Sequence, residues 1–150
     1  MFKALNLPKA NLKLSKKEGK YYIWCITRKK TLLLTPEEWV RQHAIHYLIG
    51  QKNVPPGLII SEQEINIHRL NRRCDVVIYG TDQKAKLLVE CKAPEISLDQ
   101  KVLHQIAHYN SSVNVDYLWI TNGLQHYMFY INRENGSFQA IDELPDFHSL

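Results

Sequence analysis

The sequence has no long hydrophobic run. Its longest apolar segments, residues 21–26 and 127–131, are far too short to span a bilayer, which takes about 20 apolar residues. Met1-Phe2-Lys3 is followed by no apolar stretch of the kind that secretory signals contain. We therefore expect a cytoplasmic protein that has no membrane partner.

Cysteine is scarce, and several catalytic motifs are missing. The 3 cysteines are scattered, and their odd number favours a reducing compartment over a disulfide framework. No pair of cysteines has CxxC spacing, and no Ser/His/Asp arrangement is visible. The Gly-x-x-x-x-Gly-Lys-Ser/Thr pattern of a phosphate-binding loop is also missing, so the sequence predicts no ATP-driven motor in this chain.

The composition is ordinary, but the charge is unevenly distributed. Of 150 residues, 45% are hydrophobic and 23% are charged, as is typical of a soluble globular domain. The net charge is +4, yet residues 1–30 alone hold nine basic side chains and one acid, Glu18, which leaves residues 31–150 acidic overall. A basic segment suits a polyanion such as nucleic acid, although from charge alone a solvated lysine-rich hairpin is the preferred interpretation.

Two principal helices are expected. Thr35 followed by proline is a strong helix start, so we predict a helix over residues 36–49 that ends at Gly50. Residues 97–113 have helical periodicity, with Ser97 as the expected N-cap.

Most of the remaining chain predicts strands and turns. Residues 1–20 form an irregular lead-in, and residues 31–150 form the main part of what we expect to be a single domain, with residues 1–30 as a basic lead-in and hairpin strand. The order of elements indicates a mixed sheet with two helices, of the α/β or α+β class. The predicted strands are residues 21–27, 31–34, 58–70 (one strand or two), 75–79, 86–92, 115–121, 126–131 and 138–141.

The predicted hairpin of residues 75–92 brings two acids together. Glu90 and Lys92 share one face of their strand, opposite an apolar face that includes Cys91, which argues against a thiol nucleophile. If Tyr79 pairs with Lys86, Asp75 falls opposite Glu90, with Cβ atoms about 5 Å apart.

Two carboxylates held so close repel each other unless a cation compensates, and Mg²⁺ takes such oxygen ligands. Lys92 would then polarise a water or stabilise negative charge on a transition state. The alternative is a surface ion pair between Glu90 and Lys92, with Asp75 merely starting the hairpin.

Polar residues also fall on the predicted buried faces of both helices. Glu37 and Arg41 lie one turn apart within the apolar stripe of the first helix, with Glu38 at its edge as an alternative acid. Glu37 either serves a site or bonds to Arg41, whose role we predict to be structural. In the second helix, Tyr109 lies within the inner stripe and Gln105 borders it, so Gln105 either contacts the site or is satisfied by backbone.

The order Asp75, Glu90-x-Lys92, Gln105-x-x-x-Tyr109 resembles that of the PD-(D/E)xK nuclease superfamily. Over about residues 30–145, the chain more closely resembles the N-terminal nuclease domain of type I restriction enzyme R subunits. The segments that carry this resemblance are TPEEWVRQ at 35–42, VECKAP at 89–94, QIAHYN at 105–110 and TNG at 121–123.

The resemblance implies a restriction-endonuclease-like α/β fold, with a central mixed β-sheet flanked by two principal helices and an N-terminal β-hairpin. It implies an endonuclease that hydrolyses DNA with Mg²⁺, for which Mn²⁺ can substitute, and that works with separate restriction-system subunits. Asp75 and Glu90 would be metal ligands with the Cys91 carbonyl as a third, and Glu37 would match the acid of the first helix.

By the same resemblance, Lys92 would orient the attacking water, and Gln105 and Tyr109 would position the DNA strand or the site. The alternative function is a catalytically silent DNA-binding or assembly module that keeps the nuclease-like fold. In that case the basic residues 1–30 would provide salt-dependent affinity for DNA.

Overall fold

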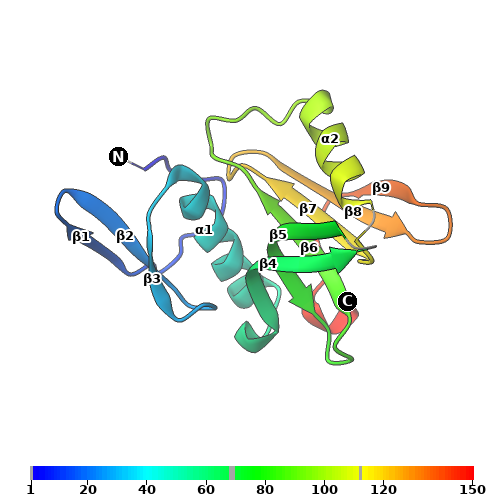
Figure 1. The fold of residues 1–150 in the computed structure, drawn as a ribbon, viewed down its shortest axis with the longest axis horizontal. Coiled ribbons are helices and arrows are strands. Elements are labelled where there is room, and N and C mark those ends of the chain that lie inside the picture. Colours follow the sequence, from blue (N-terminus) through cyan, green and yellow to red (C-terminus); the bar gives the residue numbers. More distant parts are fainter. Residues whose placement is uncertain (1, 68–69, 112) are drawn as a thin grey trace.

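The structure is a computed structural model that describes residues 2–67, 70–111 and 113–150 (Figure 1). This described part contains a three-stranded sheet, a six-stranded sheet and two α-helices. Residues 68–69 of the predicted strand 58–70, residue 112 of the predicted helix 97–113 and Met1 of the lead-in lie outside the described residues. Within the described residues, no helix has the length and apolar character needed to cross a membrane.

The smaller sheet is antiparallel, with strand order β1-β2-β3. The hairpin expected near residues 21–34 is confirmed as β2 and β3, but the lead-in is less irregular than predicted. Its residues 14–17 form β1, which pairs with β2 through the turn at Gly19, a residue with a φ of 78°. The strands are β1 (Leu14–Lys17), β2 (Lys20–Cys25) and β3 (Lys30–Leu33).

The larger sheet is mixed, as predicted, with strand order β4-β5-β6-β7-β8-β9. Its neighbours pair antiparallel except β6 and β7, which are parallel and are joined by helix α2. A parallel pair needs such a crossover connection. The strands are β4 (Ile59–Ile67), β5 (Leu70–Tyr79), β6 (Ala85–Cys91), β7 (Tyr117–Thr121), β8 (His126–Asn132) and β9 (Ser137–Ile141), and short 3₁₀ turns lie at Pro56–Leu58 and Phe147–Ser149.

Helix α1 (Pro36–Gln51) starts as the sequence predicts. The backbone N–H of Glu38 donates to the Thr35 hydroxyl at 3.1 Å, which satisfies one of the free donors of the first turn. The predicted end at Gly50 was wrong, because the Lys52 N–H still bonds to the Leu48 carbonyl at 3.2 Å.

Helix α2 (Gln100–Asn110) is shorter than predicted at both ends. Its N-cap is Asp99, whose carboxylate accepts from the Val102 N–H at 2.9 Å, and not Ser97. The periodic apolar positions at Leu98 and Val113 therefore lie outside the helix, although both side chains are buried.

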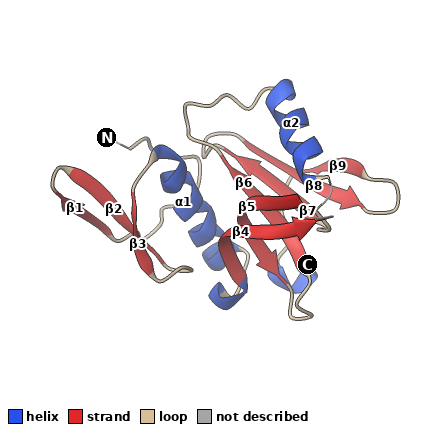
Figure 2. Cartoon of the chain, viewed as in Figure 1, coloured by secondary structure: helices blue, strands red, loops and turns tan. Residues whose placement is uncertain are grey.

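The two helices pack on opposite faces of the larger sheet (Figure 2). On β6, Leu87, Val89 and Cys91 join the apolar cluster that contains the inner residues of α1, whereas Leu88 joins the cluster that contains Ile106 of α2. Because side chains alternate along a strand, β6 is covered on both faces. The acids at the end of this strand are therefore held by a rigid, buried element.

Candidate active site

The β5–β6 hairpin brings Asp75 and Glu90 to neighbouring positions. Its ladder pairs Val76 with Val89 and runs in the predicted register as far as Ile78, so Asp75 and Glu90 are the next residues along the two strands. Beyond Ile78 the predicted pairing of Tyr79 with Lys86 was wrong. A bulge there pairs Tyr79 with Ala85, and it shifts only the turn end of the hairpin.

Both carboxylate oxygens of Asp75 are held by the protein. Its Oδ2 accepts from the backbone N–H of Cys91 at 2.8 Å, which joins the start of one strand of the hairpin to the end of the other. Its Oδ1 accepts from Nη2 of Arg41 on α1 at 3.1 Å. Asp75 is thus fixed in orientation by two donors, one of them charged.

Glu90 is buried with incomplete hydrogen bonding. Among the described residues, its buried Oε1 accepts no hydrogen bond. Burial and the neighbouring Asp75 carboxylate raise the pKa of Glu90 to about 8, against the smaller lowering effects of Lys92 and Asn110. The ionised form of Glu90 therefore lacks a compensating charge, and a cation or a proton would supply it.

Arg41 joins four carboxylates. Its side chain is only 6% exposed, and its guanidinium pairs with Glu38 at 2.8 Å, Glu37 at 2.9 Å, Asp75 at 3.1 Å and Glu62 at 3.4 Å. Burial alone would lower the pKa of Arg41, but Glu38 and Asp75 raise it above its ordinary value. The sequence predicted the contact with Glu37; the contacts with the other three acids were not predicted.

Of the two acids at the start of α1, Glu38 is the buried one and Glu37 is the more exposed one, the reverse of what the sequence predicted. Glu38 is buried and accepts from Arg41 and from Nε2 of Gln42 at 3.1 Å, whereas the Glu37 side chain is 45% exposed. The prediction that Glu37 lies deeper was wrong, because Glu38, Arg41, Gln42 and Ile45 share one helix face at spacings of three, four and seven. Burial and Asp75 raise the pKa of Glu37, which places it within electrostatic reach of the acid pair.

Lys92 and Cys91 follow Glu90 with opposite environments. Lys92 is half-buried, and its charge acts to lower the pKa of both Glu37 and Glu90, against the larger effect of burial in each. The Cys91 thiol is 1% exposed in the apolar cluster, and burial raises its pKa. As predicted, Cys91 faces the core while Lys92 faces the acids.

Gln105 and Tyr109 lie on the outer surface of α2. Both are exposed, with Tyr109 at 43%, so the prediction that Tyr109 lies in the buried stripe was wrong. Within the described ranges, the structure shows no hydrogen bond from Gln105 to the acidic cluster. Asn110 takes the buried position instead: its Nδ2 donates to the Ile106 carbonyl at 2.9 Å, and its side chain lowers the pKa of Glu90. The sequence pattern that could have predicted this burial is the spacing of four between Ile106 and Asn110, which puts both residues on the same face of the helix.

A pocket of about 540 Å³ opens over Arg41. It lies between β3, the start of α1 and β4, and Ala93 closes one side. Glu62 on β4 has a φ of 54°, a left-handed conformation that non-glycine residues rarely adopt and that is found most often near functional sites. The pocket is lined by Arg28, Leu32, Leu33, Thr35, Pro36, Glu37, Glu38, Arg41, Glu62 and Ala93.

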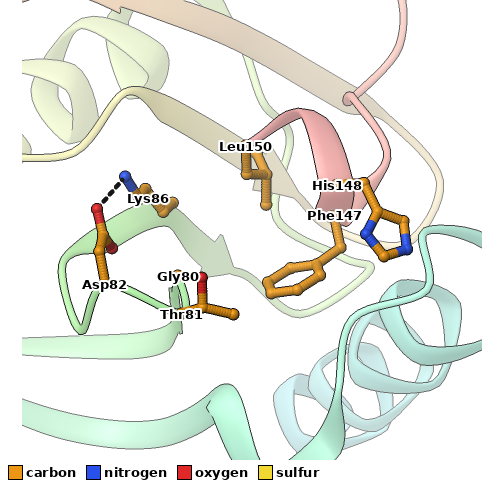
Figure 3. Close-up of a pocket in the computed structure, with 7 residues that line it drawn as sticks. All are labelled: Gly80, Thr81, Asp82, Lys86, Phe147, His148 and Leu150. Carbon is orange, nitrogen blue, oxygen red and sulfur yellow. Dashed lines mark hydrogen bonds and ion pairs between the residues drawn. The ribbon is translucent and has the colours of Figure 1, made fainter.

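A second pocket, of about 240 Å³, lies at the turn end of the same hairpin (Figure 3). There Lys86 Nζ donates to Asp82 at 2.9 Å, and Phe147 and His148 come from the C-terminal segment. None of the residues predicted from the sequence to form the site lines this pocket. The candidate site is therefore the opposite end of β5 and β6.

The donors that the sequence predicts for this end are oxygen atoms: the Asp75 and Glu90 carboxylates and the backbone carbonyl of Cys91. In the described part of the chain, no group of three or more His, Cys, Asp or Glu side chains is arranged to hold a metal ion. Mg²⁺ needs only one or two carboxylates, because it keeps several waters. Oxygen donors and the unpartnered Glu90 Oε1 fit such a cation, although one oxygen of Asp75 is already shared with Arg41.

Comparison with known proteins identifies a family and a solved structure to which this chain is similar. The sequence profile of a family described as "Type I restriction enzyme R protein N terminus" matches residues 36–145. A structure described as a fragment of an HsdR subunit of a type I restriction enzyme from Vibrio vulnificus YJ016 aligns with a TM-score of 0.53 and 16% identity. The alignment covers 77% of this chain but 24% of that one, so the likeness shows a shared fold over about a quarter of the fragment. None of the curated proteins matches significantly.

Proposed function

The chain belongs to the family of type I restriction enzyme R protein N termini, and on that basis we propose that it is a Mg²⁺-dependent DNA endonuclease of the PD-(D/E)xK superfamily with a restriction-endonuclease-like fold. The observation that carries the proposal is the Asp75–Glu90 pair, in which a buried carboxylate oxygen has no partner among the described residues and the pKa of Glu90 is raised to about 8. Perturbed acids in pairs are typical of catalytic sites.

In this proposal, Asp75, Glu90 and the Cys91 carbonyl hold Mg²⁺, for which Mn²⁺ can substitute. The bound ion would activate the attacking water and neutralise charge on the phosphate. Glu37, within reach of Asp75, would complete the acidic wall of the site.

The remaining groups prepare the site. Arg41 holds Asp75 at 3.1 Å, and the Cys91 N–H fixes the other oxygen, so this carboxylate does not rotate when substrate arrives. Lys92 donates hydrogen bonds to the water or to a phosphate oxygen as negative charge develops there. Gln105 and Tyr109 would contact the DNA strand from the exposed side of α2.

Nicking of supercoiled plasmid with Mg²⁺ tests the proposal. Asp75→Asn, Glu90→Gln and Lys92→Gln should each reduce nicking by about 100-fold or more, as expected when a group that acts on the transition state is removed. Glu134→Gln, a change of the same chemistry at an exposed turn, is the matched control and should keep full activity. Undiminished nicking by all three site variants would refute the proposal.

One observation favours a second function, a DNA-binding or assembly module without turnover. Arg41 already neutralises Asp75 in the structure, and a guanidinium at that position competes with a metal ion. Titration calorimetry separates the two functions. An endonuclease binds Mg²⁺ or Mn²⁺ in wild type but not in Glu90→Gln, whereas a silent module binds DNA and neither metal. In either case we propose that the chain works with separate restriction-system subunits.

A further inference from the structure

The three-stranded sheet has two faces of opposite character. On β2, Ile23 and Cys25 are fully buried, and Cys25 reaches the Gln42 side chain of α1, so this face packs on the helix. Residues directly opposite each other in an antiparallel pair lie on the same face. The alternate residues Tyr22 and Trp24 therefore lie on the other face, away from α1.

That outer face combines aromatic and basic side chains. The cross-strand register places Leu33 beside Tyr22 and Lys17 beside Lys20. Trp24 is 39% exposed and Leu33 is 50% exposed, values that are high for large apolar side chains at the centre of a sheet. Together with Lys13, whose carbonyl accepts from the Trp24 N–H at 3.0 Å, they form a continuous surface, which we call the outer face: Lys13, Lys17, Lys20, Tyr22, Trp24 and Leu33.

The charge around the outer face has one sign. Residues 1–30 carry nine basic side chains, and Glu18 is their only acid. A protein partner with an apolar surface would match Trp24 and Leu33 but would leave the lysines unpaired. A nucleic acid with unpaired bases matches both, because its bases stack on aromatic rings and its phosphates attract lysines.

The outer face also continues into the pocket over Arg41. Leu33 belongs to this face and at the same time lines the 540 Å³ pocket over Arg41 and Glu37. Arg28 lines the same pocket, held in place by Glu62 at 2.7 Å. A strand that lies across Trp24 toward Leu33 would therefore reach the pocket directly.

We propose that the outer face binds an unpaired segment of DNA, with bases stacked on Trp24 and Tyr22 and phosphates held by Lys13, Lys17 and Lys20. Duplex DNA presents no base faces for stacking, so the aromatic pair selects unpaired strands. That the bound strand is then cleaved rests on the proposed function; its binding does not.

Fluorescence anisotropy with a labelled oligothymidine in EDTA tests binding, because no metal-dependent cleavage occurs there. Trp24→Ala should weaken binding roughly 5- to 100-fold, as loss of one stacking ring does, and Trp24→Phe should restore most of it. DNA should quench the tryptophan fluorescence of wild type more than that of Trp24→Phe, because Trp119 is fully buried and the Trp39 ring is packed against Phe2 and His43.

The lysines are tested against a matched control. Lys17→Gln/Lys20→Gln should weaken binding and reduce the salt dependence by about 1.4 in the log–log slope, since each lost phosphate contact removes about 0.7 for a single strand. Lys84→Gln/Lys86→Gln removes the same charge at the turn end of the β5–β6 hairpin, away from the outer face and the candidate site, and should change affinity less than about 2-fold.

Three results would overturn the inference. They are an unchanged affinity in Trp24→Ala, equal effects of the two lysine pairs, and equal binding of a blunt duplex, which would mean that phosphates alone are recognised. Failure of the proposed function looks different: the oligonucleotide still binds through Trp24, but plasmid is not nicked. Melting of Trp24→Ala by circular dichroism checks that the exposed substitution leaves the fold intact.

Discussion

The charged side chains of the two sheets lie in opposite environments, exposed in one sheet and largely shielded from solvent in the other. The β1–β3 sheet has one face on α1 and the other in solvent, and its lysines are exposed; Lys16 lies over the Tyr21 ring, and within the described residues the structure shows no ion pair for them. The β4–β9 sheet is covered on both faces, and its acids Asp75 and Glu90 are largely shielded from solvent; Asp75 is held by Arg41 and by one backbone N–H. Hydrated charge can be changed with little effect on folding, whereas buried charge cannot.

Because the two sheets differ in this way, substitutions that affect DNA binding can be distinguished from those that affect catalysis. We expect substitutions on the outer face to change DNA affinity with at most a small effect on stability, whereas substitutions in the acid cluster should change activity and stability together. Arg28 and Glu62 join the two regions with an ion pair of 2.7 Å at the pocket between them. The following experiments are ordered from the largest expected effect to the smallest.

The largest effect is expected from Arg41→Ala. This change leaves Glu38 and Asp75 buried without their cation, and breaking a buried ion pair by removing one partner costs about 3–5 kcal/mol. Denaturant unfolding measures it. Arg133→Ala, which breaks the exposed pair with Asp116, is the control and should cost less than about 1 kcal/mol. Equal losses in the two variants would show that the acid cluster does not depend on Arg41.

The second-largest expected effect is a pH dependence of the free energy of unfolding, caused by Glu90. Its folded pKa of about 8 lies above its ordinary value of 4.5, so between these pH values the folded chain binds more protons than the unfolded one. The free energy of unfolding contributed by this group is therefore largest below pH 4.5 and declines as the pH rises toward 8, by on the order of a few kcal/mol. Unfolding curves across this range should show the decline, and Glu90→Gln should flatten it.

Repeating these unfolding curves with Mg²⁺ tests whether Glu90 binds a cation. A bound cation favours ionised Glu90, so saturating Mg²⁺ should remove much of the decline in wild type and have no such effect in Glu90→Gln. Ca²⁺ is a useful second probe, because it prefers the same oxygen ligands. A decline that is identical with and without either cation contradicts a metal site at Glu90.

The third effect is smaller and concerns the link between the sheets. Arg28→Gln removes the half-buried pair with Glu62, and we expect a loss of about 1 kcal/mol in the free energy of unfolding. Limited proteolysis should then cut within residues 1–35 earlier than in wild type, while the larger sheet stays protected. Lys29→Gln, next to it and exposed, is the control and should leave the cleavage rate unchanged.

The sequence predicted the elements that have strong local signals. The Thr35 cap, the β5–β6 register up to Ile78 and the mixed sheet are set by caps, alternation and turn residues close together in the chain. Strand β1 escaped prediction because its four residues have no periodicity and are exposed throughout; their pairing with β2 creates the strand.

The candidate site was predicted only where one hairpin brings residues together. Asp75 and Glu90 follow from register, but the Arg41–Asp75 contact joins a helix to a strand 34 positions later, and no local pattern encodes it. The same holds for Asn110 beside Glu90 and for the exposure of Tyr109, which depend on how α2 lies against the sheet. Tertiary packing decides these positions.

The smallest expected effect concerns repulsion between lysines of the outer face, which should lower the free energy of unfolding slightly. Lys17 and Lys20 are directly opposite each other in the β1–β2 ladder, an arrangement of like charges that destabilises a sheet. Lys17→Glu replaces the repulsion with attraction and should raise the free energy of unfolding by roughly 0.2–1 kcal/mol, while oligonucleotide affinity falls. Denaturant unfolding and anisotropy on the same variant give both numbers. A gain in stability together with a loss of binding places the function of this sheet in its lysines; a loss of both would mean that the lysines also hold the sheet together.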